Sequence, residues 1–341
     1  MHGHGDDVVV AHRDSSARAE PRPPRRREER EELERLSLNP AATFASGPGE
    51  REREEEPCEF RTCFERDRDR IVHSASFRRL AGKTQAVVHP TDHQRTRLTH
   101  AIEVAQCAVA IARGVGANLA LTDAMALGHD CGHGPGGHAS EDAFDAFLPE
   151  GYDHGPWGAD VVLRGLNLTA QTLDGIRNHS WSRPAPTTLE GEIVSWADRI
   201  AYCAHDFEDA VAAGIVTTDE LPSAVADVAG TARRIQLARF IGAVIDTTMT
   251  TGVVGMDPMT AGALGELRRF NYERIYTRPE SVAQSVTVVK VLQGLVDYFL
   301  GHPGELPAEY RTEDAVRGVV TYVGGMADRF AFDHAERLLG W

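Results

Sequence analysis

The sequence predicts an all-α protein, a helical bundle with additional C-terminal helices. From Phe60 onward, segments with apolar residues every three or four positions follow one another, separated by short stretches rich in Gly, Pro or Asn. The alternation of apolar and polar residues that marks strands is nearly absent, apart from TQAVV at 84–88. We therefore expect helices at 66–82, 97–115, 121–130, 138–147, 156–164, 169–180, 188–213, 219–246, 259–275, 279–300 and 311–337.

The N-terminal region differs in composition from the rest of the chain. Residues 1–25 combine Pro, Arg, Ser and Asp with few large apolar side chains, so we expect a disordered tail. Residues 25–38 alternate in charge and carry Leu33 and Leu36 at helical spacing, which predicts a short solvated helix. The Gly- and Glu-rich segment 46–56 is expected to be a loop.

The helix at 188–213 is the best specified of the series. Thr187 followed by Glu190 has the spacing of a capping box, and Gly214 is a suitable end. Apolar residues recur every three or four positions and form one stripe: Ile193, Trp196, Ile200, Cys203, Phe207 and Val211.

Three polar residues, Asp198, Tyr202 and Asp206, recur every fourth position of this helix. They fall on a face about 145° from the apolar stripe, at about 100° per residue. Such a trio is usually a solvated outer face. The histidine pattern described next favours a functional face instead.

Composition limits the functions that the chain can have. Acidic residues number 51 against 36 basic ones, so an anionic substrate would need a local basic pocket. The sequence shows neither a secretory leader nor a stretch of roughly eighteen apolar residues, so we expect a cytoplasmic protein without membrane contact. Residues 26–341 should form one domain, with a core at about 66–215 and a C-terminal helical part at about 216–341. Reduced thiols are expected at all five scattered cysteines: Cys58, Cys63, Cys107, Cys131 and Cys203.

Histidines gather in the central part of the sequence. A single histidine is usually a structural residue, but here His100 lies near the start of one expected helix and the His129-Asp130 pair at the end of the next. Antiparallel packing of these helices would bring the three side chains together, and Asp198 would supply a second carboxylate. Two neutral imidazoles and two carboxylates suit a divalent cation, and they leave positions open for water and a phosphate oxygen.

The order His, His-Asp, Asp is the signature of the HD superfamily, and six blocks extend the resemblance to bacterial dGTP triphosphohydrolase-like proteins. The resemblance runs from about Arg30 to the C-terminus. It implies an HD-domain helical bundle that hydrolyses deoxynucleoside triphosphates to deoxynucleoside and tripolyphosphate. The blocks are EPCEFRTCFERDRDRIVHSASFRRLAGKTQ (56–85), RTRLTHAIEVAQ (95–106), GHDCGHGPGGHASED (128–142), GLNLTAQTLDGIRNHS (165–180), ADRIAYCAHDFEDA (197–210) and LRRFNYERIYTRPE (267–280).

The resemblance also assigns roles to individual residues. It implies His138 and Glu141 as a catalytic pair, with the carboxylate orienting the imidazole. The ligands of a divalent cation would be His100, His129, Asp130 and Asp198. Mn²⁺ or Mg²⁺ is expected first, although Fe²⁺, Co²⁺ and Zn²⁺ also tolerate this ligand set.

Seven further residues match positions that contact substrate in the family. Two arginines would hold phosphate oxygens, although ordinary surface charge is the alternative for both. Two histidines would line the phosphate path, Gln85 would bond the 3′-hydroxyl, and a Tyr–Asp pair would contact the sugar. The set comprises Gln85, Arg97, His133, His154, Arg199, Tyr202 and Asp206.

One departure from the family lies in the loop before His138. Relatives read HPPFGH, whereas this chain reads HGPGGH, so Gly134 and Gly136 should make the loop more flexible. The resemblance further implies a homo-oligomer, with a nucleotide effector or single-stranded DNA as other partners. Two alternatives remain open: an HD-type nucleotidase or phosphodiesterase acting on monophosphates or cyclic nucleotides, and a non-catalytic nucleotide-binding regulator.

Overall fold

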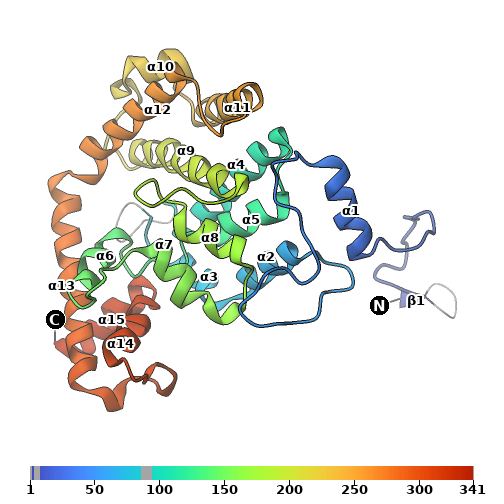
Figure 1. Ribbon diagram of the computed structural model, residues 1–341. Helices are drawn as coiled ribbons and strands as arrows, with labels where there is room; N and C mark the ends of the chain where they lie inside the picture. Colours follow the sequence, from blue (N-terminus) through green and yellow to red (C-terminus); the bar gives the residue numbers. More distant parts are fainter. Residues whose placement is uncertain (1, 4–7, 86–93, 341) are drawn as a thin grey trace.

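The computed structural model describes residues 2–3, 8–85 and 94–340, and nearly all regular structure in them is helical (Figure 1). The all-α prediction is therefore confirmed. Strands are limited to a short antiparallel pair, β1 (His2–Gly3) and β2 (Val9–Val10). Of the expected strand at 84–88, residues 86–88 lie outside the described residues, and Thr84 forms an isolated bridge with Thr96.

A central bundle of helices forms the larger apolar core. Asn118 accepts hydrogen bonds from the backbone of Ala120 and Leu121, so a helix begins directly after the left-handed turn at Gly116. The two helices on either side of this turn pack closely against each other, as expected from the sequence. The bundle comprises α2 (Cys63–His73), α3 (Ala75–Arg79), α4 (Arg97–Val115), α5 (Leu119–Gly128), α8 (Ala170–Asn178) and α9 (Leu189–Ala212).

The C-terminal helices do not form one unit. Those of the first group extend the central core, above the bundle in Figure 1: α10 (Ser223–Ala229), α11 (Arg233–Thr251) and α12 (Pro258–Asn271). Those of the second group build a separate core with two short helices of the N-terminal half: α13 (Pro279–Gly301), α14 (Ala315–Gly324) and α15 (Asp328–Leu339), with α6 (His138–Asp145) and α7 (His154–Trp157). The helix α1 (Arg27–Ser37) matches the one expected at 25–38, whereas disorder of residues 1–25 stays a prediction.

Several expected helices are shorter than their apolar patterns indicated. The helix expected at 66–82 is interrupted at Ser74, whose side chain caps α3, and it ends in a 3₁₀ turn at Leu80–Gly82. The helix expected at 219–246 breaks at Gly230, which has a φ of 77°. The one expected at 311–337 divides into α14 and α15. Single turns of π-helix follow α7 and α12, at Gly158–Val162 and Tyr272–Tyr276.

The predicted capping box at Thr187 is wrong. Helix α9 begins one residue later, where the side chain of Thr188 accepts a hydrogen bond from Gly191 N. The Glu190 carboxylate is fully buried and instead accepts from Thr43 and from the backbone N–H of Asn118. A long-range contact therefore replaces the local cap.

A close backbone crossing brings α7 beside the HD dipeptide. A β-carbon on Gly132 would lie 2.5 Å from Gly158 N and still nearer to the His154 carbonyl oxygen, which is closer than van der Waals contact allows. Since only glycine permits this approach, it sets the position of His154 relative to Asp130.

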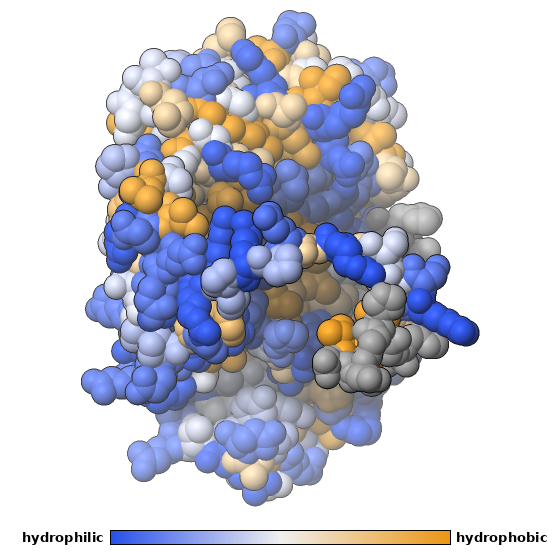
Figure 2. All heavy atoms as spheres, turned by 90° about the vertical axis from the view of Figure 1, so that its right-hand side faces the viewer, coloured by the Kyte–Doolittle hydropathy of each residue, from blue (hydrophilic) through white to orange (hydrophobic). Residues whose placement is uncertain are grey.

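The surface is mostly hydrophilic, with apolar side chains gathered in the upper part of the view in Figure 2. Figure 1 places α10–α12 at that height, and exposed apolar residues of this part of the chain include Ile235, Met249, Val253 and Met259. Among the described residues, no helix is both long and apolar enough to span a bilayer.

Candidate functional site

A cavity of about 500 Å³ is lined by residues of the central bundle, of α6, α7 and the loop before α6, of the segment at 84–85, and of α12 to α13. Eleven of the thirteen residues singled out by the sequence line it, and the other two, His129 and Glu141, contact lining residues from behind. The eleven are Gln85, Arg97, His100, Asp130, His133, His138, His154, Asp198, Arg199, Tyr202 and Asp206.

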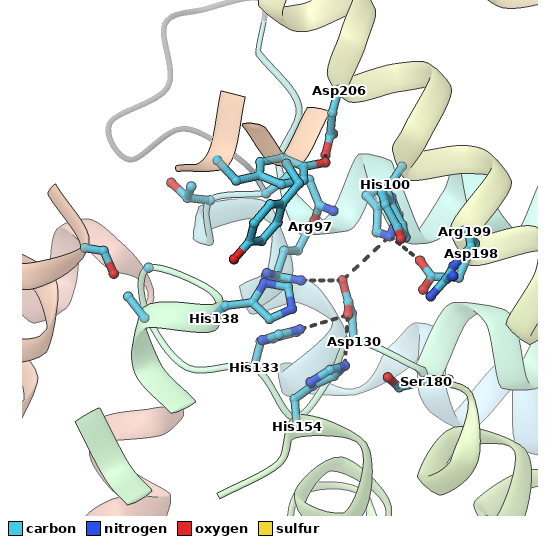
Figure 3. Close-up of a pocket in the computed structure, with 18 of the residues that line it drawn as sticks. Arg97, His100, Asp130, His133, His138, His154, Ser180, Asp198, Arg199 and Asp206 are labelled. Carbon is cyan, nitrogen blue, oxygen red and sulfur yellow. Dashed lines mark hydrogen bonds and ion pairs between the residues drawn. The ribbon is translucent and has the colours of Figure 1, made fainter. Parts of the chain in front are cut away.

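The four expected metal ligands lie close together beside this cavity, and Figure 3 shows His100, Asp130 and Asp198 of this group. His100 Nε2 lies 3.1 Å from Asp198 Oδ1 and 3.9 Å from Asp130 Oδ2. His129 Nε2 lies 3.5 Å from Asp130 Oδ1 and 3.7 Å from Asp198 Oδ1. The side chains come from α4, from the turn after α5 and from α9, as the sequence predicted.

The tautomer of His129 fits a metal ligand. Its Nδ1 lies 2.6 Å from the carbonyl oxygen of Ala126 and donates to it, which leaves the lone pair on Nε2. This Nε2 is buried and has no hydrogen-bond partner among the described residues. A buried lone pair that faces two carboxylates is the arrangement that a divalent cation satisfies.

The charges of the two carboxylates are strongly stabilised. Burial opposes ionisation of Asp130, but Arg97 and the surrounding imidazoles outweigh it and hold the pKa of Asp130 well below its usual value. Burial also opposes ionisation of Asp198, but the hydrogen bond from His100 outweighs it and lowers the pKa of Asp198. The same hydrogen bond raises the pKa of His100, although burial alone would lower it. A divalent cation would displace the shared proton, because ligands bind metals in their deprotonated forms.

Arg97 is the main basic residue next to these ligands. Its side chain is 1% exposed, and Nη1 donates to Asp130 Oδ2 at 2.7 Å. The Nε and Nη2 groups are buried without a partner among the described residues, and Gly137 lies close to Nη2. Surface charge therefore does not explain this arginine. It retains donors that suit a phosphate oxygen.

A cluster of histidines surrounds the other oxygen of Asp130. His133 Nε2 lies 3.2 Å from Asp130 Oδ1, and its ring stacks on that of His154 at a centroid distance of 3.7 Å. The Glu141 carboxylate, expected to orient His138, instead accepts a hydrogen bond from His154 Nδ1 at 2.6 Å. The reason is the close crossing at Gly132, which brings α7 alongside α6.

The protonation of these histidines differs from ring to ring. Burial lowers the pKa of His154, but its hydrogen bond with Glu141 prevails and the net pKa is raised. His138 is exposed to the cavity, but partial desolvation by the cavity wall and the charge of Arg97 lower its pKa to about 4. The two rings therefore differ, because Glu141 favours the protonated form of His154 whereas His138 is neutral at pH 7.

His179 belongs to the site although sequence reasoning missed it. The residue is 2% exposed, and its Nε2 lies 3.1 Å from that of His154. With His129 and Asp198 it also forms a group of donor atoms within 4.8 Å of one another. Its presence in the matched block at 165–180 was the only available signal, because a lone histidine rarely indicates function.

The outer part of the cavity joins the polar face of α9 to the C-terminal helices. Asp206 accepts a hydrogen bond from the Tyr276 hydroxyl, and Tyr202 Oη accepts one from Arg268 Nε at 3.1 Å. The polar trio therefore faces the cavity and not bulk solvent. Arg268, Tyr272 and Tyr276 lie in the matched block at 267–280, to which the sequence analysis assigned no role.

Comparisons with known proteins identify the family of the chain. The HD domain family matches residues 97–203, and the phosphohydrolase-associated domain family matches 254–337. A deoxyguanosinetriphosphate triphosphohydrolase-like protein of Caldanaerobacter subterraneus is 39% identical over 316 residues, which cover 89% of this chain and 93% of that protein. A protein of the same description from Clostridium perfringens is 36% identical over 331 residues, covering 92% of this chain and 97% of its own.

A solved phosphohydrolase of Bacteroides thetaiotaomicron is more distant, with 16% identity, a TM-score of 0.47 and coverage of 77% of this chain and 66% of that one. The curated relatives decide the assignment, because they extend over nearly the whole chain at more than a third identity. This chain is an HD-domain phosphohydrolase and belongs to the family of deoxyguanosinetriphosphate triphosphohydrolase-like proteins.

Proposed function

We propose that this hydrolase cleaves deoxynucleoside triphosphates, dGTP or several of them, into deoxynucleoside and tripolyphosphate. The observation that carries the proposal is the position of Arg97. Its guanidinium lines the cavity and pairs with Asp130 through Nη1, while Nε and Nη2 are buried in the cavity wall without a partner among the described residues. A phosphoryl group at this point would lie beside a positive charge that is held in place by Asp130.

A divalent cation, Mn²⁺ or Mg²⁺ first, would be held by His100, His129, Asp130 and Asp198. When bound, it supplies Lewis-acid polarisation of a phosphoryl oxygen and of water. The residues named for it fit, because the unpartnered Nε2 of His129 faces both carboxylates.

The proton transfers are assigned to the histidine cluster. Water attacks the α-phosphorus and the bond to the 5′-oxygen breaks, so one proton must leave the water and one must reach the 5′-oxygen. His138 is neutral at pH 7 and accepts the first proton, whereas His154, whose pKa is raised by Glu141, donates the second proton to the leaving oxygen. Glu141 keeps His154 in this state through their hydrogen bond.

The remaining substrate contacts follow the shape of the cavity. Arg97 and Arg199 bind phosphate oxygens, and His133 lines the same path. On the outer side, Gln85, Tyr202 and Asp206 face the deoxyribose. The amide oxygen of Gln85 is buried without a partner among the described residues, so a sugar hydroxyl could donate to it.

Product analysis tests the proposal. The pure protein is incubated with each deoxynucleoside triphosphate and Mn²⁺ or Mg²⁺, and the phosphate product is identified by ³¹P NMR. Tripolyphosphate in equal amount to deoxynucleoside is the expected result. Pyrophosphate or orthophosphate as the sole product would contradict it, and activity on monophosphates or cyclic nucleotides alone would favour a nucleotidase or phosphodiesterase.

Assembly belongs to the proposal as well. We expect a homo-oligomer, with a nucleotide effector or single-stranded DNA as further partners, on the family resemblance alone. Light scattering with and without nucleotide measures the oligomeric state directly. A monomer under both conditions would contradict the expected homo-oligomer.

A further inference from the structure

One carboxylate of the C-terminal helices joins two separate segments of the cavity wall. Asp328, the first residue of α15, has 8% exposure. Its Oδ1 accepts a hydrogen bond from Gly136 N at 2.8 Å, and its Oδ2 accepts one from Thr84 N at 2.9 Å. Each segment leads directly to a cavity residue, to His138 in one case and to Gln85 in the other.

A buried lysine makes a second connection between the same parts of the molecule. Lys83 is 3% exposed, and its Nζ donates to the carbonyl oxygen of Gly324 at 2.9 Å and to that of His133. Its own carbonyl oxygen accepts from Arg97 N at 3.0 Å. The strand-like segment at 83–85, the loop at 133–137 and the end of α14 are therefore held to one another by side chains.

The loop at 133–137 needs such external support. Gly136 and Gly137 have φ values of 72° and 65°, and together with Gly134 they give this loop more conformational freedom than the HPPFGH loop of relatives. A β-carbon on Gly136 would lie 2.5 Å from Val288 Cγ1, so α13 also contacts the loop closely. Within the loop region, the Ser140 hydroxyl accepts from Gly134 N and donates to the Gly137 carbonyl oxygen, and the C-terminal helices add the contacts of Asp328 and Val288.

We propose that Asp328 is a positioning residue, which fixes the loop before His138 and the Thr84–Gln85 segment in the arrangement that the reaction needs. The phosphohydrolase-associated part of the chain then completes the active site of the HD core by determining where its loop lies. The kinetic part of this inference rests on the proposed function, whereas the structural part does not. A displacement of about 1 Å at a catalytic group reduces turnover by up to about a hundredfold.

The test compares Asp328→Asn with Asp333→Asn in the full-length protein. Asn retains one acceptor but presents an N–H₂ group to the other backbone N–H, so one of the two hydrogen bonds is lost. Asp333 lies on the same helix with a side chain that is 64% exposed, which makes its variant the matched control. Hydrogen–deuterium exchange is measured at 82–85 and 131–138, and kcat and KM for dGTP are measured with Mn²⁺.

For Asp328→Asn we expect roughly tenfold faster exchange in both segments, unchanged exchange in α9, and a 10- to 100-fold lower kcat, the range seen for lost outer contacts of a site. Mn²⁺ affinity should stay within about twofold, because the metal ligands lie on other elements. Exchange equal to that of Asp333→Asn would overturn the proposal. Faster exchange in a protein that hydrolyses none of the deoxynucleoside triphosphates would support the structural part of the inference while refuting the proposed function.

If Asp328→Asn should fail to fold, Lys83→Met provides a second route. It removes the other connection while keeping a similar length of apolar side chain. Faster exchange at 131–138 is again expected, and exchange equal to that of the wild-type protein there would overturn the proposal.

Discussion

The guanidinium of Arg199 stacks on the indole of Trp181, with its central carbon 3.5 Å from the ring centroid. Trp181 is itself fixed, because its Nε1 donates to the Ser195 carbonyl oxygen at 3.1 Å and its ring meets that of Trp196 edge-on. A guanidinium that stacks through its face keeps its N–H edge available for a phosphate. Trp181 therefore orients the arginine at the entrance of the cavity.

Replacing Trp181 should weaken substrate binding more than turnover. We predict that Trp181→Ala raises KM for a deoxynucleoside triphosphate by roughly 3- to 30-fold, the range of cation–π energies, with kcat within about threefold. Trp181→Phe keeps an aromatic face and should stay close to the wild-type KM. Steady-state kinetics decide the matter, and equal KM values for the Ala and Phe variants would contradict it.

Asp198 is a better probe of the metal centre than Asp130. Removing the Asp130 carboxylate would leave Arg97 as a buried charge without its partner, at about 3–5 kcal/mol of stability. The Asp198 side chain is 19% exposed and pairs with imidazoles that can lose their protons. We predict that Asp198→Ala melts within a few degrees of the wild type but retains no divalent metal.

Metal content is measured by elemental analysis after dialysis against Mn²⁺, alongside a thermal melt. Glu192→Gln, on the same helix α9 and outside the cavity lining, is the control. Stoichiometric Mn²⁺ in Asp198→Ala would show that this carboxylate is not a ligand.

The stability of the fold should depend on Asp206 between about pH 4 and 6. Burial raises the pKa of Asp206 from 3.8 to about 6, against the hydrogen bond from Tyr276. Because the folded protein binds this proton more tightly than the unfolded chain, stability falls as pH rises through that window, by about 2–3 kcal/mol. Asp206→Asn should therefore melt higher than wild type at pH 7.5 and equally at pH 4. It should also raise KM, and a lower melting temperature at pH 7.5 would contradict the prediction.

In the loop at 133–137, Gly136 packs so closely against Val288 of α13 that a larger residue does not fit without a shift. Gly136→Phe restores the residue of relatives, but the new β-carbon would lie 2.5 Å from Val288 Cγ1 at a φ of 72°. We predict a loss of about 1–3 kcal/mol, part of which Val288→Ala should recover. Chemical denaturation measures both values. Gly262→Ala, whose β-carbon meets nothing within 4 Å, should show no such loss.

Local patterns in the sequence were sufficient for the helical fold and for the four expected metal ligands, whereas the other cavity residues were indicated by the family resemblance. The residues of α4, α5 and α9 were found because helical periodicity and the order of His, His-Asp and Asp are visible within short windows. All five cysteines are free thiols, as their scattered positions indicated. The metal ligands and substrate contacts converge geometrically, while their chemical roles stay predictions.

The contacts that sequence reasoning missed are those set by tertiary packing. Glu141 pairs with His154 because two backbones cross at Gly132, and no spacing in the sequence encodes that crossing. Glu190 does not cap α9, because its buried carboxylate accepts hydrogen bonds from Asn118 N and from Thr43. Asp328 lies far along the chain from Thr84 and Gly136, so no short sequence pattern indicated that it contacts them.

The crossing at Gly132 also limits which substitutions the protein can tolerate. Every amino acid other than glycine would place a β-carbon against the backbone of the His154–Gly158 turn, which has no flexible side chain to yield. Gly165, where a β-carbon meets nothing within 4 Å, carries no such restriction. A saturation library selected for folding should therefore retain a single codon family at position 132 and tolerate broad variation at position 165.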